Sequence, residues 1–304
     1  MSDGSNPVAR GQLENDDIAL RPVAGALGAE ISGVRPWRPM TAAVVDAVRA
    51  ALDRYLVIFF RDCELTLEQL KTFSACFGEL SRVPYVGALA QHPEVIAVLK
   101  EADERNISTF GGTWHTDFSF LERPPVASIL YAEQVPAVGG DTIWANMYAA
   151  YAALSPGMQR TLDGLKAMHS GHVYGAARPP TDVATSTSIS ISRNNPEADV
   201  ERPHPVVRVN PRTGERALYV NPVYTTRFQD MSEEESRGLL DYLYAHCTRA
   251  EFTCRFHWAP GSIAVWDNRY TQHLAVNDYD GHRRCMYRTS TAGERPLGPG
   301  ELSC

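Results

Sequence analysis

Three side chains that could share one metal ion constrain how this chain can fold. His115 and Asp117 form a His-x-Asp pair in the stretch "GGTWHTDFSF", and His273 lies near the far end of the sequence. In an extended segment, residues i and i+2 point to the same side, so His115 and Asp117 can reach one point in space. His273 can join them only if the chain folds back on itself, as a barrel of antiparallel strands does. The pattern therefore favours a mainly β domain with helices at its flanks.

The rest of the sequence indicates where strands, helices and loops lie. Apolar runs bounded by Gly, Pro or charged residues predict strands within 18–34, 55–62, 95–100, 127–135, 141–147, 168–175, 204–221, 252–269 and 273–291. Helical spacing and start signals predict helices over 41–55, 66–77, 149–154 and 232–246, and a further helix from Ser155-Pro156. We expect 1–17 to be a flexible tail and 18–304 to be one domain, with lid loops near 101–113 and 176–203.

The composition narrows the class of partner. The net charge of −7 argues against nucleic acid or an anionic membrane as the main partner, because both select a basic face. No apolar run reaches the roughly 20 residues that a membrane span needs, and the N-terminus lacks the pattern of a secretory signal. The six cysteines are scattered without a C-x-x-C pair, which indicates free thiols in a reducing cytoplasm. We therefore expect a cytoplasmic protein that acts on a small molecule.

The candidate ligands and two arginines downstream of them indicate a particular chemistry. Two imidazoles and one carboxylate are the donor set of the facial triad in non-haem Fe(II) oxygenases, which leaves open positions on the metal. Arg284 and Arg288 share one face of the last predicted strand. Guanidinium groups that point into an apolar interior need anionic partners, and their planar fork suits a carboxylate. A dicarboxylic cosubstrate and an anionic substrate would satisfy both arginines.

Two other classes of protein could carry the same residues. A zinc-dependent cupin-type hydrolase or lyase could use two histidines and one carboxylate, but it would not need the two arginines for a second dicarboxylate. A binding or regulatory protein without activity is the other alternative, although such proteins usually lose a ligand. Arg288 also has a structural alternative, a salt bridge with Asp117 or Asp267.

Taken together, the spaced positions resemble the taurine dioxygenase family. They are His115-x-Asp117, Thr142 in "GGDTIWANM", the segment "WDNRYTQH" that ends in His273, and Arg284 and Arg288. This family of Fe(II)/2-oxoglutarate-dependent dioxygenases includes the aryloxyalkanoate dioxygenases and alkylsulfatases, and the resemblance runs from about residue 18 to residue 296. The stretches "ALYVN" and "FTCR" are similar to the branch that acts on aryloxypropionates. The resemblance implies a double-stranded β-helix, a cupin-like jelly roll, with helices packed outside.

The resemblance also implies the cofactors and the reaction. The ligand set would bind Fe(II), with O2 as oxidant and 2-oxoglutarate chelating the metal through its keto-acid end. Thr142 and Arg284 would hold the distal carboxylate of 2-oxoglutarate, and Arg288 would meet the anionic group of the substrate. The enzyme would hydroxylate a small anionic substrate, with cleavage where the product is unstable, and would release succinate and CO2. Members of the family often form dimers or tetramers, so we expect a homo-oligomer.

One segment departs from the family pattern. The taurine enzyme has a His-rich run after "FGEL" that contacts the sulfonate, whereas this chain has "FGELSRVPYVGALAQ", without histidine. The difference favours a larger or more apolar substrate than taurine. The candidate pocket-lining residues are instead aromatic or apolar, namely Tyr85, Val86, Phe110, Phe118, Tyr174 and Tyr224.

Overall fold

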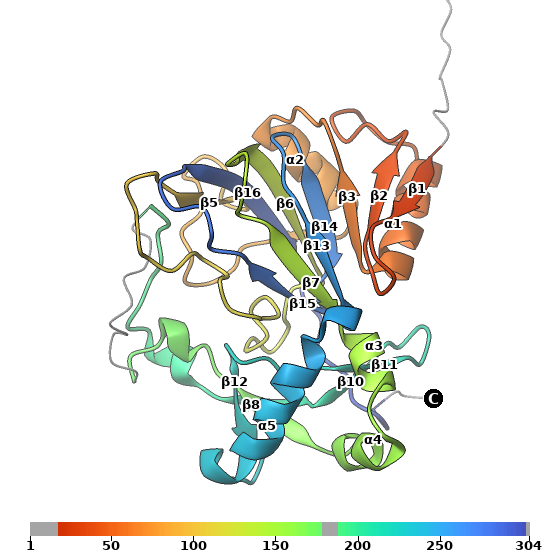
Figure 1. Ribbon diagram of the computed structural model, residues 1–304, viewed down its shortest axis with the longest axis vertical. Helices are drawn as coiled ribbons and strands as arrows, with labels where there is room; N and C mark the ends of the chain where they lie inside the picture. Colours follow the sequence, from red (N-terminus) through yellow and green to blue (C-terminus); the bar gives the residue numbers. More distant parts are fainter. Residues whose placement is uncertain (1–17, 178–187, 302–304) are drawn as a thin grey trace, which may run out of the picture.

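The computed structural model describes residues 18–177 and 188–301, and within them the chain is mainly β with flanking helices (Figure 1). The predicted tail 1–17 and the stretch 178–187 of the predicted lid lie outside the described residues. The large sheet of the described part has the order β1 (Ala19–Pro22), β2 (Ala29–Ser32), β3 (Val57–Phe60), β14 (Ile263–Asp267), β6 (Ala127–Gln134), β16 (Arg284–Thr291) and β4 (Leu80–Ser81), and β5 (Ile96–Lys100) also pairs with β16. Apart from the parallel pair β2–β3, these strands are antiparallel.

Smaller sheets complete the β structure. One has the order β13 (Thr253–Phe256), β7 (Thr142–Asn146) and β15 (Thr271–Ala275). Another has the order β12 (Thr225–Phe228), β8 (Lys166–His169) and β9 (Arg202–Pro205). The predicted hairpin within 204–221 is confirmed as the pair β10 (Val207–Val209) and β11 (Arg216–Leu218). In Figure 1 the large sheet fills the upper half of the molecule, and the β8 and β10 sheets lie below it.

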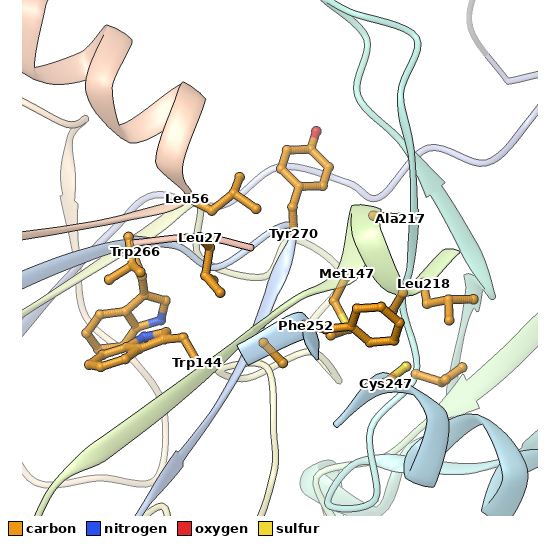
Figure 2. Close-up of a cluster of buried hydrophobic side chains, with 14 of the residues drawn as sticks. Leu27, Leu56, Trp144, Met147, Ala217, Leu218, Cys247, Phe252, Trp266 and Tyr270 are labelled. Atoms are coloured by element: carbon orange, nitrogen blue, oxygen red, sulfur yellow. The ribbon is translucent and has the colours of Figure 1, made fainter. Parts of the chain in front are cut away.

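The main apolar core lies where the large sheet meets the sheet of β13, β7 and β15. Phe59 of β3 stacks on Phe256 of β13 with ring centroids 4.0 Å apart, and Trp144 of β7 meets the edge of Trp266 of β14 at 5.8 Å. Figure 2 shows the two tryptophans beside each other in this cluster, which extends to Phe252 and the residues around it. Burying such large rings contributes strongly to stability, so these contacts hold the two sheets at a fixed spacing.

The predicted helices are confirmed, and each begins within two residues of its predicted start. They are α1 (Ala42–Tyr55), α2 (Leu67–Ala75), α3 (Met147–Ala152), α4 (Pro156–Leu162) and α5 (Glu233–Cys247). The predicted capping box of α5 is confirmed, because Ser232 and Glu235 bond each other's backbone amides, and α2 begins with another box at Thr66. In Figure 1, α1 and α2 lie beside the large sheet, while α3, α4 and α5 lie in the lower half of the molecule. None of the described helices is long and apolar enough to cross a membrane.

Two local expectations need correction. The predicted strand 168–175 ends at His169, and the chain continues into the 3-10 turn η1 (His172–Tyr174). The two strands predicted around Asp280-Gly281 do not form a hairpin, because β15 pairs with β7 while β16 pairs with β4, β5 and β6. The connection 276–283 therefore carries the chain from one sheet to the other. Its two ends border the candidate site.

Candidate active site

The structure brings His115, Asp117 and His273 together, as the sequence predicts. One donor atom of each lies within 4.8 Å of the others, and all three side chains are buried. The Oδ1 atom of Asp117 is 3.6 Å from Nε2 of His115 and 3.9 Å from Nε2 of His273. The two histidines also face each other across a backbone bridge, with N–H to O=C distances of 3.0 and 2.8 Å. His273 on β15 thus holds His115 through this bridge, and Asp117 lies in the turn that follows His115.

The two imidazoles are oriented in different ways. Nδ1 of His115 lies 2.7 Å from the carbonyl of Thr113, which places its proton there and leaves Nε2 free to bind a metal. Nδ1 of His273 is buried and has no hydrogen-bond partner among the described residues. Its ring instead packs against Trp266 and Trp144, with centroids 4.9 and 6.5 Å away. Aromatic packing thus fixes His273 where a hydrogen bond fixes His115.

Two residues that sequence reasoning missed hold Asp117. Ser128 on β6 donates a 2.8 Å hydrogen bond from Oγ to Oδ2 of Asp117. The side chain of Asn268 bonds both the backbone N–H and the backbone carbonyl of Asp117, at 2.8 and 3.0 Å. Signals for both exist in the sequence, since Ser128 is a polar residue in the apolar run "ASILYAEQ" and Asn268 lies in "WDNR". Neither signal indicates that the partner of these side chains is Asp117.

We expect Ser128→Ala to weaken the binding of a divalent metal. The substitution leaves Oδ2 of Asp117 without its donor, and loss of a residue that orients a metal ligand typically costs about 10- to 100-fold in affinity. Titration of the metal-free protein with Mn(II) or Fe(II), followed by calorimetry, measures the change. Ser236→Ala is the matched control, because Ser236 is equally buried but lies on α5. Equal affinity of the two variants would contradict the prediction.

The charges of the cluster suit a cation. Burial opposes ionisation of Asp117, but the positive charge of Arg288 holds the pKa of that carboxyl well below its usual value. Burial and the neighbouring His115 lower the pKa of His273 well below the usual value for imidazole. The site therefore offers an ionised carboxylate and a neutral imidazole, which are the forms that bind metals.

Arg284 lies at the start of β16, and its buried guanidinium forms no salt bridge with the described residues. The residue is only 3% exposed, and its Nε and Nη2 atoms have no hydrogen-bond partner within the described chain. Burial lowers the pKa of Arg284, as expected for a cation removed from water. Thr142, also buried, accepts a 3.0 Å hydrogen bond from the Trp258 indole. Its hydroxyl hydrogen remains available to an acceptor.

Arg288, four residues further along β16, forms the salt bridge that the sequence left as an alternative. Its Nη1 atom donates to Oδ1 of Asp117 at 2.8 Å. Its Nε and Nη2 atoms are buried and have no partner in the part of the chain that the structure describes. Arg288 also lines a cavity of about 180 Å³, whose other lining residues are Ser81, Arg82, Val83, Val86, Ala88, Pro93, Glu94, Ile96 and Ser290. One guanidinium thus joins the candidate metal site to a cavity that a small molecule could fill.

Comparisons with known proteins agree with this arrangement of residues. The model of the family "Taurine catabolism dioxygenase TauD, TfdA family" matches residues 19–290. The chain belongs to this family. An alpha-ketoglutarate-dependent sulfate ester dioxygenase from Pseudomonas putida is 39% identical, over 100% of this chain and 98% of its own length.

Solved structures agree with the assignment to the TauD/TfdA family. A taurine dioxygenase from Burkholderia xenovorans has a TM-score of 0.77 and 38% identity, and the match covers 93% of this chain and 94% of that one. AAD-2 in complex with Mn(II) and N-oxalylglycine has a TM-score of 0.73 and 28% identity, covering 92% and 98%. This chain is accordingly an oxidoreductase, an alpha-ketoglutarate-dependent dioxygenase. The zinc-dependent hydrolase or lyase is thereby disfavoured.

The aromatic residues predicted to line the pocket lie together in one cluster. Phe118, Tyr174 and Tyr224 are buried, and Tyr85 stacks on Tyr174 with centroids 5.4 Å apart. The rings of Phe118 and Phe110 lie 5.3 and 5.8 Å from the guanidinium carbon of Arg288. Of the six residues, the cavity beside Arg288 is lined by Val86 alone. Phe110 and Phe118 thus contact the guanidinium of Arg288, while Tyr85, Tyr174 and Tyr224 pack in the same cluster.

Proposed function

We propose that this protein uses Fe(II), 2-oxoglutarate and O2 to hydroxylate a small organic anion, with oxidative cleavage where the hydroxylated product is unstable. The observation that carries the proposal is a cluster of two histidines and one carboxylate that contacts Arg288, with Arg284 four residues away on the same strand. Both guanidinium groups are buried and have nitrogens without hydrogen-bond partners among the described residues. Buried guanidinium N–H donors without a hydrogen-bond partner are costly, so the fold accepts them where anions bind. Two such groups next to one metal site match a reaction with one anionic cosubstrate and one anionic substrate.

His115, Asp117 and His273 would hold the iron. Their donor set of two neutral nitrogens and one carboxylate oxygen fits Fe(II) and leaves three positions for other ligands. When bound, the metal with 2-oxoglutarate and O2 supplies the oxidising power, with release of succinate and CO2. The protein's part is to hold the carboxylate ionised, orient both imidazoles and exclude water from the buried site. The rigidity of the sheets makes that orientation reproducible.

Arg284 and Thr142 would bind the distal carboxylate of 2-oxoglutarate. The unpaired Nε and Nη2 atoms of Arg284 can form two parallel charge-assisted bonds to a carboxylate. The Thr142 hydroxyl, already accepting from Trp258, can donate its own hydrogen to the same group. Arg284 is at the start of β16 and Thr142 at the start of β7, so the two would approach the cosubstrate from different sheets.

Arg288 and its cavity would bind the substrate. The unpaired nitrogens would hold an anionic head group, while Val83, Val86 and Ile96 would contact a small apolar body. The ion pair between Arg288 and the head group would be shielded from water by Phe110, Phe118, Tyr85 and Tyr224. Because a relative of 39% identity is named a sulfate ester dioxygenase, we propose sulfate esters as the first class to test. Sulfonates, aryloxyalkanoates and amino-acid derivatives follow.

Further parts of the proposal concern the whole protein. We propose that the two packed sheets form the double-stranded β-helix that the family resemblance implies. Loop 101–113 and the region 176–203 would act as lids of one domain, and the protein would work in the cytoplasm as a homo-oligomer. Within the second region, the backbone amide of Ser192 donates a 2.7 Å hydrogen bond to the carbonyl of Tyr85, next to the cavity residue Val86, which supports a covering position over the substrate cavity.

The proposed cofactors can be tested without turnover. We expect anaerobic addition of Fe(II) and 2-oxoglutarate to give a weak visible charge-transfer band, because the keto acid chelates the metal. Anaerobic absorption spectroscopy during a titration measures it, and Fe(II) alone or succinate in place of 2-oxoglutarate gives the baseline. Folded protein that binds Fe(II) but develops no band on addition of the keto acid would contradict the proposed function.

The substrate class can be tested by succinate release. We expect alkyl sulfates to stimulate O2-dependent formation of succinate above the rate without substrate, since Arg288 presents two unpaired donors to a tetrahedral anion. Alkyl sulfonates, aryloxyalkanoates and N-substituted amino acids belong in the same screen, with the corresponding neutral alcohols as controls. Stimulation by the alcohols alone would overturn the anionic assignment.

A further inference from the structure

The connection 276–283 between β15 and β16 is fastened to loop 101–113. Three hydrogen bonds join Asn277 to the Ile107 carbonyl, the Asn106 amide to Asp280, and the hydroxyls of Tyr279 and Thr109, at 2.8, 2.9 and 2.8 Å. The buried ammonium of Lys100 bonds both Asn277 and Asp280, which stiffens the connection. Of the three bonds, the one between Tyr279 and Thr109 is buried, so it is the strongest candidate for transmitting a change.

Tyr279 also borders the proposed cosubstrate site. Its side chain is 3% exposed, and the guanidinium carbon of Arg284 lies over its ring, 5.8 Å from the centroid. Gly140 closes the other side, because an added Cβ there would lie 3.2 Å from Cδ and Nε of Arg284 and 3.3 Å from Tyr279. Gly140 has a φ of +69°, which also favours glycine. Arg284 is thus confined in a slot between an aromatic ring and bare backbone.

The far end of loop 101–113 reaches a candidate metal ligand. The Gly111 carbonyl accepts a 2.9 Å hydrogen bond from the amide of Ala275, two residues after His273. The Cα of Gly111 faces the imidazole of His115, so closely that an added Cβ would lie 3.2 Å from Cε1. A continuous set of contacts therefore runs from Arg284 through Tyr279 and loop 101–113 to His115.

Resting on the proposed binding of 2-oxoglutarate at Arg284, we propose that Tyr279 is a positioning residue that couples this site to loop 101–113. Its ring orients the guanidinium for the distal carboxylate, and its hydroxyl holds Thr109 and hence the loop. The two functions belong to different parts of one side chain. A carboxylate on Arg284 restrains the arginine and, through Tyr279, favours the fastened state of the loop.

Hydrogen exchange with a ligand that cannot react tests the coupling. In wild-type protein loaded with Mn(II), N-oxalylglycine should slow amide exchange within 106–112 by roughly 5-fold, the effect of stabilising about one hydrogen bond. Tyr279→Phe, which keeps the ring, should bind N-oxalylglycine within roughly 3-fold of wild type in calorimetry but lose the slowed exchange. Tyr242→Phe is the matched control, because Tyr242 is 48% exposed on α5.

A second set of variants separates the ring from the hydroxyl. Tyr279→Leu removes the ring and should weaken binding of N-oxalylglycine roughly 5- to 30-fold, since the guanidinium loses its cation–π partner. The apparent KM for 2-oxoglutarate should rise in parallel, with kcat changed less than 3-fold, and Tyr279→Phe should restore KM. Thr109→Val should reproduce the exchange behaviour of Tyr279→Phe, and the double variant should be no worse than either single one.

The outcomes distinguish this inference from the proposed function. If N-oxalylglycine binds without slowing amide exchange within 106–112, the role of Tyr279 is overturned. The same holds if Tyr279→Leu binds N-oxalylglycine as tightly as the wild type. Either result leaves the dioxygenase assignment intact. Additive effects of Tyr279→Phe and Thr109→Val would also overturn it, because the two hydroxyls would then act independently. Failure of wild-type protein to bind N-oxalylglycine in the presence of Mn(II) would overturn both proposals.

Discussion

Replacing His115 with alanine should abolish O2-dependent succinate formation and weaken Fe(II) binding by more than about 100-fold. Substituting a residue that only orients a metal ligand already lowers metal affinity about 10- to 100-fold, and His115 would be a ligand itself. Its Nε2 atom lies 3.6 Å from Oδ1 of Asp117, and no other described His, Cys, Asp or Glu completes the cluster. Calorimetric titration with Fe(II) under anaerobic conditions, followed by a succinate assay, measures both effects.

The matched control for this prediction is His282→Ala, because His282 is exposed. That variant should bind Fe(II) and form succinate as the wild type does. Circular dichroism and thermal unfolding of His115→Ala show whether the fold survives, which the pairing of its backbone with His273 favours. Undiminished turnover in folded His115→Ala would refute its assignment as a ligand.

Arg284→Met should raise the concentration of 2-oxoglutarate needed for half-maximal activity by roughly 30- to 4,000-fold. Truncating one partner of a buried, hydrogen-bonded charge pair costs about 2–5 kcal/mol, and each 1.4 kcal/mol is tenfold. Methionine fills a similar volume in the slot beside Tyr279, so the loss reports the charge and its donors. Fe(II) affinity should stay within roughly 3-fold, because Arg284 has no contact with the metal cluster among the described interactions.

A neighbouring arginine supplies the control for Arg284. Arg283 points to the other side of the strand, where it pairs with Glu101 and is 37% exposed. Surface pairs of this kind are worth about 0–1 kcal/mol, so Arg283→Met should change the 2-oxoglutarate requirement by only a few fold. Arg284→Lys should fall between wild type and Arg284→Met, since lysine keeps the charge without the planar fork. Equal requirements in Arg283→Met and Arg284→Met would count against the assigned site.

The parts that could be predicted from the sequence are those that local chemistry specifies. Ser232 and Glu235 identify the start of α5 because a capping box is completed within four residues. His115 and Asp117 could be paired because alternation along an extended segment is a local rule. Two arguments make His273 the third candidate ligand, namely the family resemblance and the need for the chain to fold back on itself. Its backbone bridge to His115 shows that this reasoning identified true neighbours.

The parts that could not be predicted depend on which strands become neighbours. Ser128 contacts Asp117 because the register of β6 places it there, and a single slip of register would turn it to the other face. Tyr279 meets Thr109 because the connection 276–283 passes between two sheets, whereas the turn signal Asp280-Gly281 alone suggests a hairpin. Turn chemistry specifies the local bend but not the partners of the strands on either side.

The mutual backbone hydrogen bonds of His115 and His273 have a consequence for how the protein would acquire a metal ion. A zinc finger assembles only around its ion, whereas here the backbone bridge between His115 and His273 brings two of the candidate ligands together in advance. Metal binding is then coupled to little folding. A chelator should therefore remove the metal reversibly, without denaturing the protein. Two imidazoles and one carboxylate do not by themselves select one divalent ion, because the intrinsic affinities of such donors follow the Irving–Williams order. Cellular metal supply, more than the protein, would decide whether the occupant can activate oxygen.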